Sequence, residues 1–334
     1  FCKGRSPGDT HLMDFCREPC LGKEPSKNRF LIVSLNPTYQ VIVGYGRLNE
    51  GHVNRTDRWC NGFSGKGFNV ARKLADFGAK AVLLTHMNPA RIEECRTEAK
   101  ALGFEVDCVS DPSPIRTCVT ILQNRRRGSS KEKCTIPFDV SESMTTTELV
   151  ENSPPIEGDD TQAKVLGEYE RLLDASDCVI ITGTRSFGYD SNIYANMTAM
   201  ARLAGKYTIL DIKGQDLLRC LSNEEEFLPN LIKPNMEEFI QTFGCEEDPV
   251  AVLERLNCNA VITNGSKGCF VYDSKSREGL VHIGSLRVKP RNTTGCGDAF
   301  TAGLAYSLMR GCDLLAACHE GTMAGAAKAQ EKPI

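Results

Sequence analysis

The chain has 334 residues, 41% of them apolar and 25% charged, so it is long enough to bury a substantial core. Its net charge of −3 argues against nucleic acid or an anionic membrane surface as a partner. No apolar run approaches the ~18 residues of a membrane-spanning helix, and we find no signal-type apolar segment, so we expect no membrane association.

The sixteen cysteines are scattered, and several lie inside apolar runs. Buried reduced thiols are typical of a reducing, cytoplasmic compartment, with an organelle or a cytoskeletal assembly left open. Cys16 and Cys20 are spaced C-x₃-C, with Cys2 and His11 nearby. Because no second ligand pair follows at finger spacing, zinc there is a minor alternative, and we assign no metal site to protein ligands.

Residues 1–28 are polar and aperiodic, and we interpret them as an N-terminal extension of a single domain over 29–334. The apolar run 30–35 predicts a buried strand. Residues 41–55 are mixed and glycine-containing, which favours edge hairpins. A glycine loop at 61–69 then leads into an amphipathic helix that stops at Gly78.

Strands and helices alternate along most of the remaining chain, which predicts an α/β fold with a doubly wound, largely parallel sheet and helices on both faces. The strands are expected at 81–84, 104–109, 178–182, 208–212 and 260–272 (a strand–turn–strand unit), and the helices at 90–102, 165–173, 193–204, 217–221, 250–256 and 314–329. Residues 115–122 alternate as a further strand. The polar stretch 124–146, with three consecutive arginines, is predicted to be a surface insertion.

The stretch 289–300 carries the strongest chemical signal. A glycine-containing turn, Gly295-Cys296-Gly297, precedes Asp298 and a segment with helical apolar spacing. Backbone N–H groups at such a helix start attract an anion. A carboxylate beside that anion can accept the proton of a substrate hydroxyl that attacks phosphorus. The alternative is a glycine-rich turn with an ordinary capping Asp.

Four motifs together resemble the ribokinase-like (PfkB) carbohydrate kinase family over roughly residues 30–330. They are Gly65-Lys66-Gly67-x-Asn69, Lys233-Pro234-Asn235-x-x-Glu238, Thr263-x-Gly265-x-x-Gly268 and Thr294-Gly295-Cys296-Gly297-Asp298. The stretches 35–37, 51–55 and 147–152 are similar to the branch of 1-phosphofructokinase and tagatose-6-phosphate kinase. The resemblance implies a ribokinase-like fold with a small β-sheet lid near 40–57 and 115–123.

The resemblance also implies site residues. Asp298 would be the base, and the N–H groups of Gly295, Cys296 and Gly297 would form the anion hole. Sugar-phosphate binding would fall to Gln40, Gly65, Lys66, Gly67, Asn69, Arg116 and Thr184, with Arg116 on the substrate's own phosphate. ATP and Mg²⁺ would be held near Lys233, Asn235, Glu238, Thr263, Gly265, Gly268 and Thr293. For Lys66 and Glu238 the alternatives are loop geometry and a first-turn acid, respectively.

Two departures from the family pattern bear on activity. Gln40 stands where the family has an Asp that binds sugar hydroxyls, and an amide supplies no charge. Arg185, in the loop 183–188, would either grip a phosphate or block the pocket.

Two functions follow from these motifs. The favoured one is ATP-dependent phosphoryl transfer to a hydroxyl of a sugar phosphate of the fructose 1-phosphate or tagatose 6-phosphate type. The alternative is a weakly active or inactive subunit with a structural role in a larger assembly, joined through the N-terminal extension. A nucleoside or an unphosphorylated sugar is a less favoured substrate. The resemblance also suggests a homodimer formed through the lid.

Overall fold

The computed structural model describes residues 28–124, 144–244, 248–276, 278–291 and 293–331. Its large sheet has the strand order β13-β12-β11-β10-β9-β8-β1-β4-β5. The strands are β1 (Arg29–Val33), β4 (Lys80–Met87), β5 (Glu105–Ser110), β8 (Cys178–Thr182), β9 (Tyr207–Asp211), β10 (Leu231–Ile232), β11 (Asn259–Thr263), β12 (Cys269–Tyr272) and β13 (Leu280–Ile283).

The strands from β5 to β11 run parallel, whereas β12 and β13 pair antiparallel at one edge. Strand β1 lies between β4 and β8, so the chain first builds the sheet toward β5 and later builds it in the other direction from β8. All five residues of β8 are buried, as expected for a central parallel strand covered on both faces. In open α/β sheets, ligands bind outside the carboxyl ends of the strands at such a switch point.

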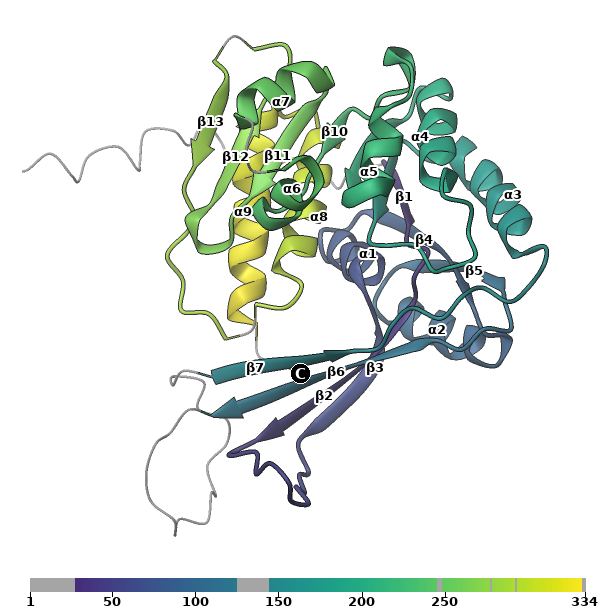
Figure 1. Cartoon of the computed structure of the whole chain (residues 1–334), viewed down its shortest axis with the longest axis vertical. Coiled ribbons are helices and arrows are strands. Elements are labelled where there is room, and N and C mark those ends of the chain that lie inside the picture. Colours follow the sequence, from purple (N-terminus) through teal and green to yellow (C-terminus); the bar gives the residue numbers. More distant parts are fainter. Residues whose placement is uncertain (1–27, 125–143, 245–247, 277, 292, 332–334) are drawn as a thin grey trace, which may run out of the picture.

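Helices cover both faces of this sheet (Figure 1). One face packs against α1 (Lys66–Asp76), α2 (Pro89–Ala101), α8 (Cys296–Met309) and α9 (Leu314–Gln330). The other packs against α3 (Thr161–Asp174), α4 (Ile193–Leu203), α5 (Gly214–Leu221), α6 (Met236–Phe243) and α7 (Pro249–Leu256). Each face therefore has its own apolar core, and α1 and α8 lie on the same face.

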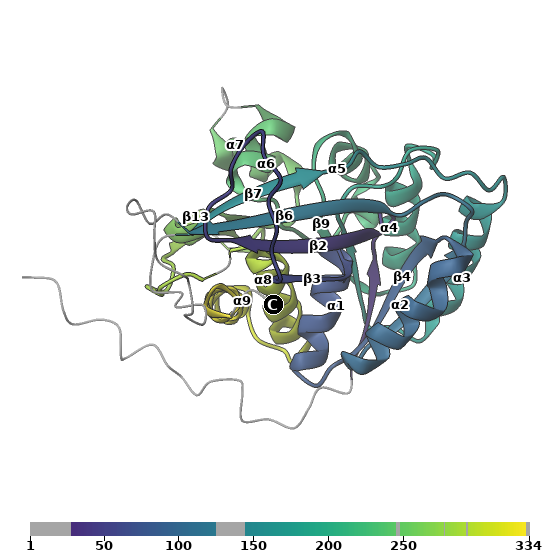
Figure 2. The ribbon, with the colours of Figure 1, turned by 90° about the horizontal axis from the view of Figure 1, so that it is seen from below.

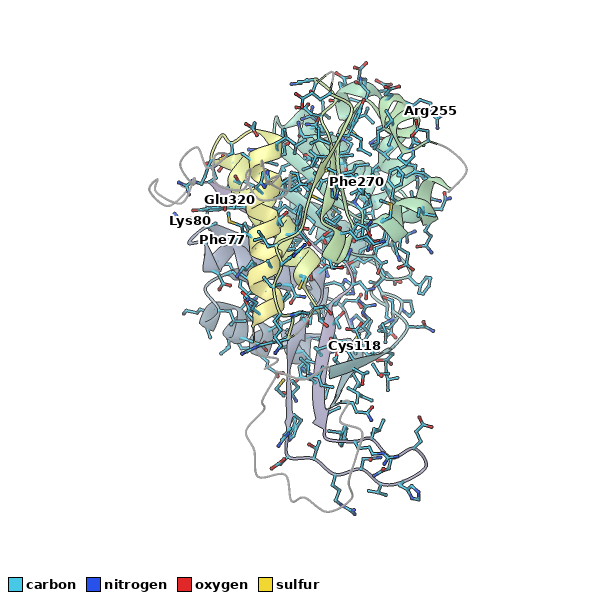
Figure 3. The ribbon with its side chains drawn as sticks, turned by 90° about the vertical axis from the view of Figure 1, so that its left-hand side faces the viewer. Phe77, Lys80, Cys118, Arg255, Phe270 and Glu320 are labelled. Atoms are coloured by element: carbon cyan, nitrogen blue, oxygen red, sulfur yellow. The ribbon has the colours of Figure 1, made fainter. Side chains whose placement is uncertain are left out.

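A second sheet, the lid, projects from the body and has the strand order β3-β2-β6-β7 (Figures 1 and 2). Its strands are β2 (Thr38–Tyr45), β3 (Trp59–Ser64), β6 (Arg116–Asn124) and β7 (Met144–Val150). Figure 3 shows the separation between the two sheets, with Cys118 labelled on the lid and Phe270 on the large sheet. The lid begins where β1 ends, so it stands beside the carboxyl ends of the parallel strands.

The predicted doubly wound sheet and the separate small sheet are both confirmed. Strands β3, β7 and β13 were missed, and β7 begins at Met144, inside the predicted insertion 124–146. Residues 125–143 of that insertion and residues 1–27 of the extension lie outside the described residues. Within the described ranges, no helix is both long enough and apolar enough to span a bilayer.

Candidate active site

Several polar side chains of the candidate site follow the carboxyl ends of neighbouring strands, and of these the sequence predicted Lys233 and Thr263 but not Asp211. Asp211 ends β9, Lys233 follows β10 and Thr263 ends β11, while Lys66 lies at the start of α1. The side chains therefore lie close together, beside the carboxyl ends of the parallel strands, and the first turn of α8 lies at the same place. The close approach of α1 to the sheet requires glycine at position 67, because a Cβ there would lie 2.4 Å from the Cβ of Ser34.

Asp298 lies in the first turn of α8, directly after the Gly295 cap, and is 7% exposed. The Nδ2 of Asn69, on α1, donates a 2.8 Å hydrogen bond to its Oδ2. Burial and the nearby Asp211 carboxylate raise the pKa of Asp298 to about 6, although Asn69, Lys66 and Lys233 oppose the shift. This carboxyl group is therefore mostly ionised at neutral pH yet basic enough to accept a proton.

The turn before Asp298 begins α8 and borders a cavity. Gly295, the N-cap of α8, adopts the left-handed conformation with φ 78° and has no side chain with which to cap the helix. Gly295 and Gly297 line the cavity described below, whereas the N–H of Cys296 donates to the carbonyl of Thr293 at 3.3 Å. Burial raises the pKa of the Cys296 thiol, which argues against a nucleophilic thiolate there.

A network of two lysines and two carboxylates lies next to Asp298. Lys66 Nζ is 3.1 Å from Asp211 Oδ1 and 3.3 Å from Glu238 Oε1, and Lys233 Nζ is 3.4 Å from Asp211 Oδ1. Thr301 on α8 donates to the other oxygen of Asp211 at 2.9 Å. The network therefore joins β9, α1, α6 and α8 around one carboxylate.

Charge pairing sets the protonation states of this network. Burial would raise the pKa of Asp211, but Lys233 and Lys66 hold it below its ordinary value. Burial would lower the pKa of Lys66, but Asp211, Glu238 and Asp298 raise it above its ordinary value. Both groups therefore stay charged at neutral pH. From the sequence, Asp211 was predicted only as part of a strand. The feature that could have identified it as a site residue is its position as a charged residue at the end of an apolar run.

Asn235 and Glu238 form a capping box at the start of α6. Asn235 Oδ1 accepts the N–H of Glu238 at 2.8 Å, and Glu238 Oε2 accepts the N–H of Asn235 at 3.0 Å. The other oxygen of Glu238 faces Lys66. Glu238 is thus both a first-turn acid and part of the charged network, so the two interpretations of this residue are compatible.

These groups line one cavity of about 730 Å³. Lys66 comes from α1, and β7 of the lid contributes Thr146 and Glu148. The remaining lining residues belong to the strand ends, the start of α6 and the glycine turn: Asp211, Lys233, Asn235, Glu238, Thr263, Thr293, Thr294, Gly295, Gly297 and Asp298. The cavity thus contains many of the predicted nucleotide and phosphoryl groups, together with two lid residues to which the sequence had assigned no role in the site.

Glycines 265 and 268, predicted to cradle the nucleotide, lie in the turn between β11 and β12, beyond Thr263. Gly268 has φ 93°, and a Cβ there would lie 2.0 Å from the carbonyl oxygen of Ile283 on β13. Only glycine fits this close approach between the turn and the neighbouring strand.

The predicted sugar-phosphate residues lie beside this cavity, toward the lid. Arg116 Nε donates to Thr38 Oγ1 at 2.8 Å, and that hydroxyl is 3.4 Å from where a Cβ of Gly65 would lie. Gln40 Nε2 donates to Thr120 Oγ1 at 2.7 Å. Thr184 Oγ1 accepts from Asn36 Nδ2 at 2.8 Å. Arg116 is therefore near the glycine loop, while the side-chain amide of Gln40 bonds to another residue of the lid.

Arg185 is held away from the catalytic groups. Its Nε is 3.1 Å from Asp216 Oδ1 on α5, and its NH1 donates to the carbonyl of Tyr189 at 2.9 Å. It is not among the residues that line the cavity. In this structure, Arg185 neither fills the cavity nor points a free guanidinium into it.

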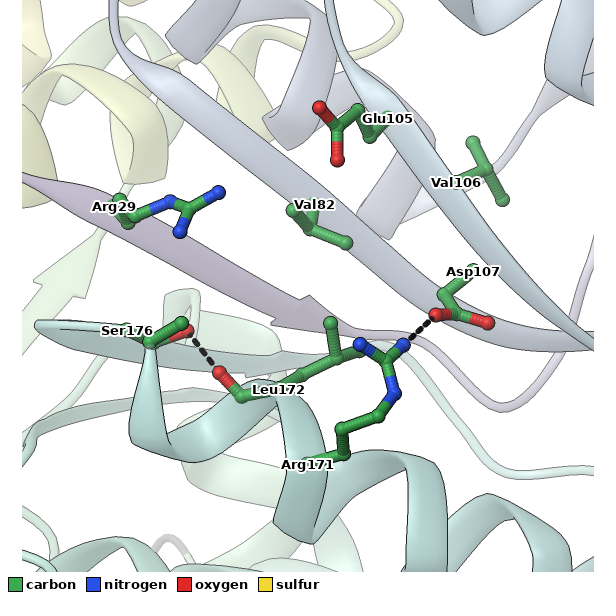
Figure 4. Close-up of a pocket in the computed structure, with 9 residues that line it drawn as sticks. Arg29, Val82, Glu105, Val106, Asp107, Arg171, Leu172 and Ser176 are labelled. Atoms are coloured by element: carbon green, nitrogen blue, oxygen red, sulfur yellow. Dashed lines mark hydrogen bonds and ion pairs between the residues drawn. The ribbon is translucent and has the colours of Figure 1, made fainter.

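A second cavity, of about 190 Å³, lies where β1 begins (Figure 4). It is bounded by residues of β4, β5 and α3, and there Arg171 pairs with Asp107 while Ser176 donates to the carbonyl of Leu172 at 2.8 Å. Because Arg29 is the first residue of β1, this cavity lies at the opposite end of the sheet from Asp298. It contains none of the predicted site residues.

Comparisons with known proteins identify the family of this chain. The family model described as pfkB family carbohydrate kinase matches residues 32–333. A tagatose-6-phosphate kinase of Staphylococcus epidermidis is 24% identical over 288 residues, which cover 84% of this chain and 85% of that protein.

Two solved structures share the fold. One, described as a possible 1-phosphofructokinase from Thermotoga maritima, has a TM-score of 0.75 and 21% identity, with 92% of this chain and 93% of that one covered. The other is the tetrameric inhibited form of phosphofructokinase-2 from Escherichia coli. It has a TM-score of 0.72 and 19% identity, covering 90% of this chain and 94% of that one.

Proposed function

Since this chain belongs to the pfkB family of carbohydrate kinases, we propose that it transfers the γ-phosphoryl group of ATP to a hydroxyl of a sugar phosphate. The fructose 1-phosphate or tagatose 6-phosphate type is favoured, because a curated relative over most of the chain is a tagatose-6-phosphate kinase. The observation that carries the proposal is the buried Asp298 carboxylate, held by Asn69 at the N-terminus of α8 in a cavity that also contains Lys66 and Lys233.

Asp298 acts as the general base. Its pKa of about 6 lets it be ionised at neutral pH and still take the proton of the attacking hydroxyl. The hydrogen bond from Asn69 fixes the orientation of the carboxylate, since it occupies one of the two oxygens. Positioning of this kind is a large part of catalysis in phosphoryl transfer.

The positive groups of the cavity stabilise the transferred phosphoryl group. The N-terminus of α8 supplies backbone N–H groups at Gly295 and Gly297, both of which line the cavity. Lys66 and Lys233 add two ammonium groups that Asp211 and Glu238 hold in place. Fixed charges aimed at developing negative charge lower the barrier without reorganisation during the reaction.

The donor set also fits Mg²⁺. The oxygens of Asp211, Glu238 and Asn235 line the cavity, and hard oxygen ligands, few in number and completed by water, are what this ion prefers. When bound with ATP, the ion would neutralise phosphate charge. Since lysines already contact Asp211 and Glu238, we assign these carboxylates to the water shell of the ion.

Arg116 is the proposed ligand of the phosphate that the sugar already carries. Arg116 is the first residue of β6, and its hydrogen bond to Thr38 holds its side chain beside the glycine loop that precedes α1. A planar guanidinium suits a phosphate because it donates two parallel hydrogen bonds.

The outer face of the lid is the proposed contact with a second copy of the chain. Val43 pairs with Trp59 and Ile121, and Val119 pairs with Val41 and Leu149, so these side chains form two adjacent apolar rows on one face. Trp59 is 60% exposed and Leu149 is 55% exposed. Such a patch favours association. Incorporation into a larger assembly through residues 1–28 stays a hypothesis, as does a reducing compartment, which fits the free cysteines of the described residues.

The test of the proposed activity is ADP release from ATP and Mg²⁺ with a panel of sugar phosphates. We expect turnover with the purified chain and a loss of several orders of magnitude in Asp298→Asn. Asp76→Asn, on the exposed end of α1, serves as the matched control and should retain activity. The absence of turnover on the whole panel, together with no thermal shift on adding ATP, would favour the structural-subunit alternative.

A further inference from the structure

A side chain of β7, in the lid, reaches the glycine turn before Asp298. Successive residues of a strand point to opposite faces, so Thr146 and Glu148 share the face that lines the cavity, whereas Thr147 and Leu149 face outward. Glu148 Oε1 accepts a hydrogen bond from Thr294 Oγ1 at 3.3 Å. These two residues are separated by 146 positions in the chain, so the contact joins the lid to the body.

The position of Thr294 gives this contact its significance. Thr294 directly precedes Gly295, the left-handed cap of α8, and lines the cavity together with Gly295, Gly297 and Asp298. The lid therefore touches the turn whose N–H groups face the phosphoryl group, three to four residues from the base. A displacement of this turn would move both the anion site and the carboxylate.

A second hydrogen bond lies on the same face of the lid, next to Glu148. Glu148 pairs in register with Thr120 of β6, which is 3% exposed and accepts the Nε2 of Gln40 from β2 at 2.7 Å. Because Gln40 pairs in register with Cys118, the residues Gln40, Thr120 and Glu148 form a diagonal polar row on one face of the lid, with a hydrogen bond between the first two. This row gives Gln40 a role in the lid that does not depend on sugar binding.

We propose that Glu148 is a positioning residue, and that its hydrogen bond to Thr294 latches the lid to the glycine turn and keeps water out during phosphoryl transfer. This inference rests on the proposed kinase activity. It predicts that breaking the latch lowers kcat and increases the fraction of ATP that is lost to water, because a site that is not closed admits water as a competing nucleophile.

The decisive experiment is a double-mutant cycle. Glu148→Leu and Thr294→Val each remove one partner, and each should lower kcat by about 3- to 10-fold, as expected for one hydrogen bond. Because both remove the same interaction, the double variant should be no slower than about 2-fold beyond either single one. Glu148→Gln keeps an acceptor oxygen and should lose less activity. Thr147→Val, on the outward face of the same strand, is the matched control.

Two further readouts separate the latch from general damage. The ADP released per phosphorylated sugar should rise above the wild-type ratio in both single variants, which loss of stability alone would not cause. Hydrogen exchange should also increase at the amides of β7 and of residues 295–298 in Thr294→Val, and this needs no substrate. Additive effects in the cycle, an unchanged product ratio or unchanged exchange would overturn the latch. If the wild type transfers nothing to any sugar phosphate, the proposed function fails, while the exchange experiment still decides whether the latch exists.

Discussion

Asn69 Nδ2 donates a hydrogen bond of 2.8 Å to Asp298 Oδ2, which joins the first turns of α1 and α8 across 229 positions of the chain. Two glycine-containing segments thereby meet, and a Cβ on Gly295 would lie 3.5 Å from the same Asn69 nitrogen. The proposed base is thus positioned by a residue from a distant part of the sequence.

The pH dependence of the reaction should report Asp298. Since burial raises its pKa to about 6, the base is protonated below that pH. We expect kcat/KM to fall about tenfold per pH unit below pH 6 and to reach a plateau above about pH 7. A profile of kcat/KM from pH 4.5 to 8 tests this, with stability checked across the range. A flat profile down to pH 5 would contradict the assignment.

Asp298→Asn should stabilise the fold while it abolishes activity. A carboxyl group whose pKa is raised from 3.8 to about 6 binds its proton more tightly when folded, so stability declines as pH rises between these values. At pH 7 the ionised group costs up to about 3 kcal/mol, which the neutral amide avoids. Thermal unfolding should show a higher Tm for the variant at pH 7 and a smaller difference near pH 4. A lower Tm at pH 7 would argue against this balance.

Lys66→Met should impair transfer strongly. It removes one ammonium group from the cavity and one of the two lysines that pair with the buried Asp211. The pair between Asp211 and Lys233 remains. Loss of a positioned charge costs about 10²- to 10³-fold in kcat. Lys73→Met is the control from the same helix, because Lys73 pairs with Asp76 and Glu331 instead. Steady-state kinetics on both variants decide the matter, and equal losses would remove the catalytic role of Lys66.

Arg116→Ala should affect one substrate only. We expect KM for the sugar phosphate to rise by at least about tenfold while KM for ATP changes little, because a bidentate phosphate contact is lost. Arg116→Lys should recover part of the loss, since charge returns without the planar fork. Parallel increases in both KM values would contradict the assignment.

Arg185→Ala should leave catalysis nearly unchanged. The guanidinium is held by Asp216 and the carbonyl of Tyr189, away from the residues that line the cavity. We expect a change in kcat/KM of less than about twofold and a destabilisation of about 1 kcal/mol from the partly buried ion pair. A large change in KM for the sugar phosphate would show that Arg185 reaches the substrate.

Trp59→Arg should dissociate the proposed homodimer. Trp59 is an exposed apolar side chain on the outer face of the lid, and a charge there would be buried without a partner at the interface. Light scattering coupled to size-exclusion chromatography measures the mass directly. A wild-type chain that is monomeric at micromolar concentration would remove the proposal before any variant is made.

The sequence was informative where the pattern was strongly periodic. Strand β8 and helix α4 begin at the predicted residues, because apolar runs bounded by polar turns leave few alternatives. The motifs around Asn69, Lys233 and Asp298 also met at one site, since parallel strands place their carboxyl ends together.

The features that the sequence did not predict depend on contacts between segments that are far apart in the chain. Strand β7, with Thr145, Thr146 and Thr147, looks like a polar loop until β6 lies beside it. Asp211 is an ordinary strand-end residue until two lysines from distant segments reach it. Arg185 pairs with Asp216 on a different element, so its direction could not be read from the loop alone.

The place of β1 between β4 and β8 has a consequence for synthesis. Residues 29–110 emerge first and can form β1, β4 and β5 with one side of β1 unpaired until Cys178–Thr182 arrives. The hydrogen-bond partner of Asn69, Asp298 in α8, is synthesised more than two hundred residues later. An incomplete chain that lacks α8 therefore also lacks Asp298, so the proposed phosphoryl transfer can begin only after α8 has been made.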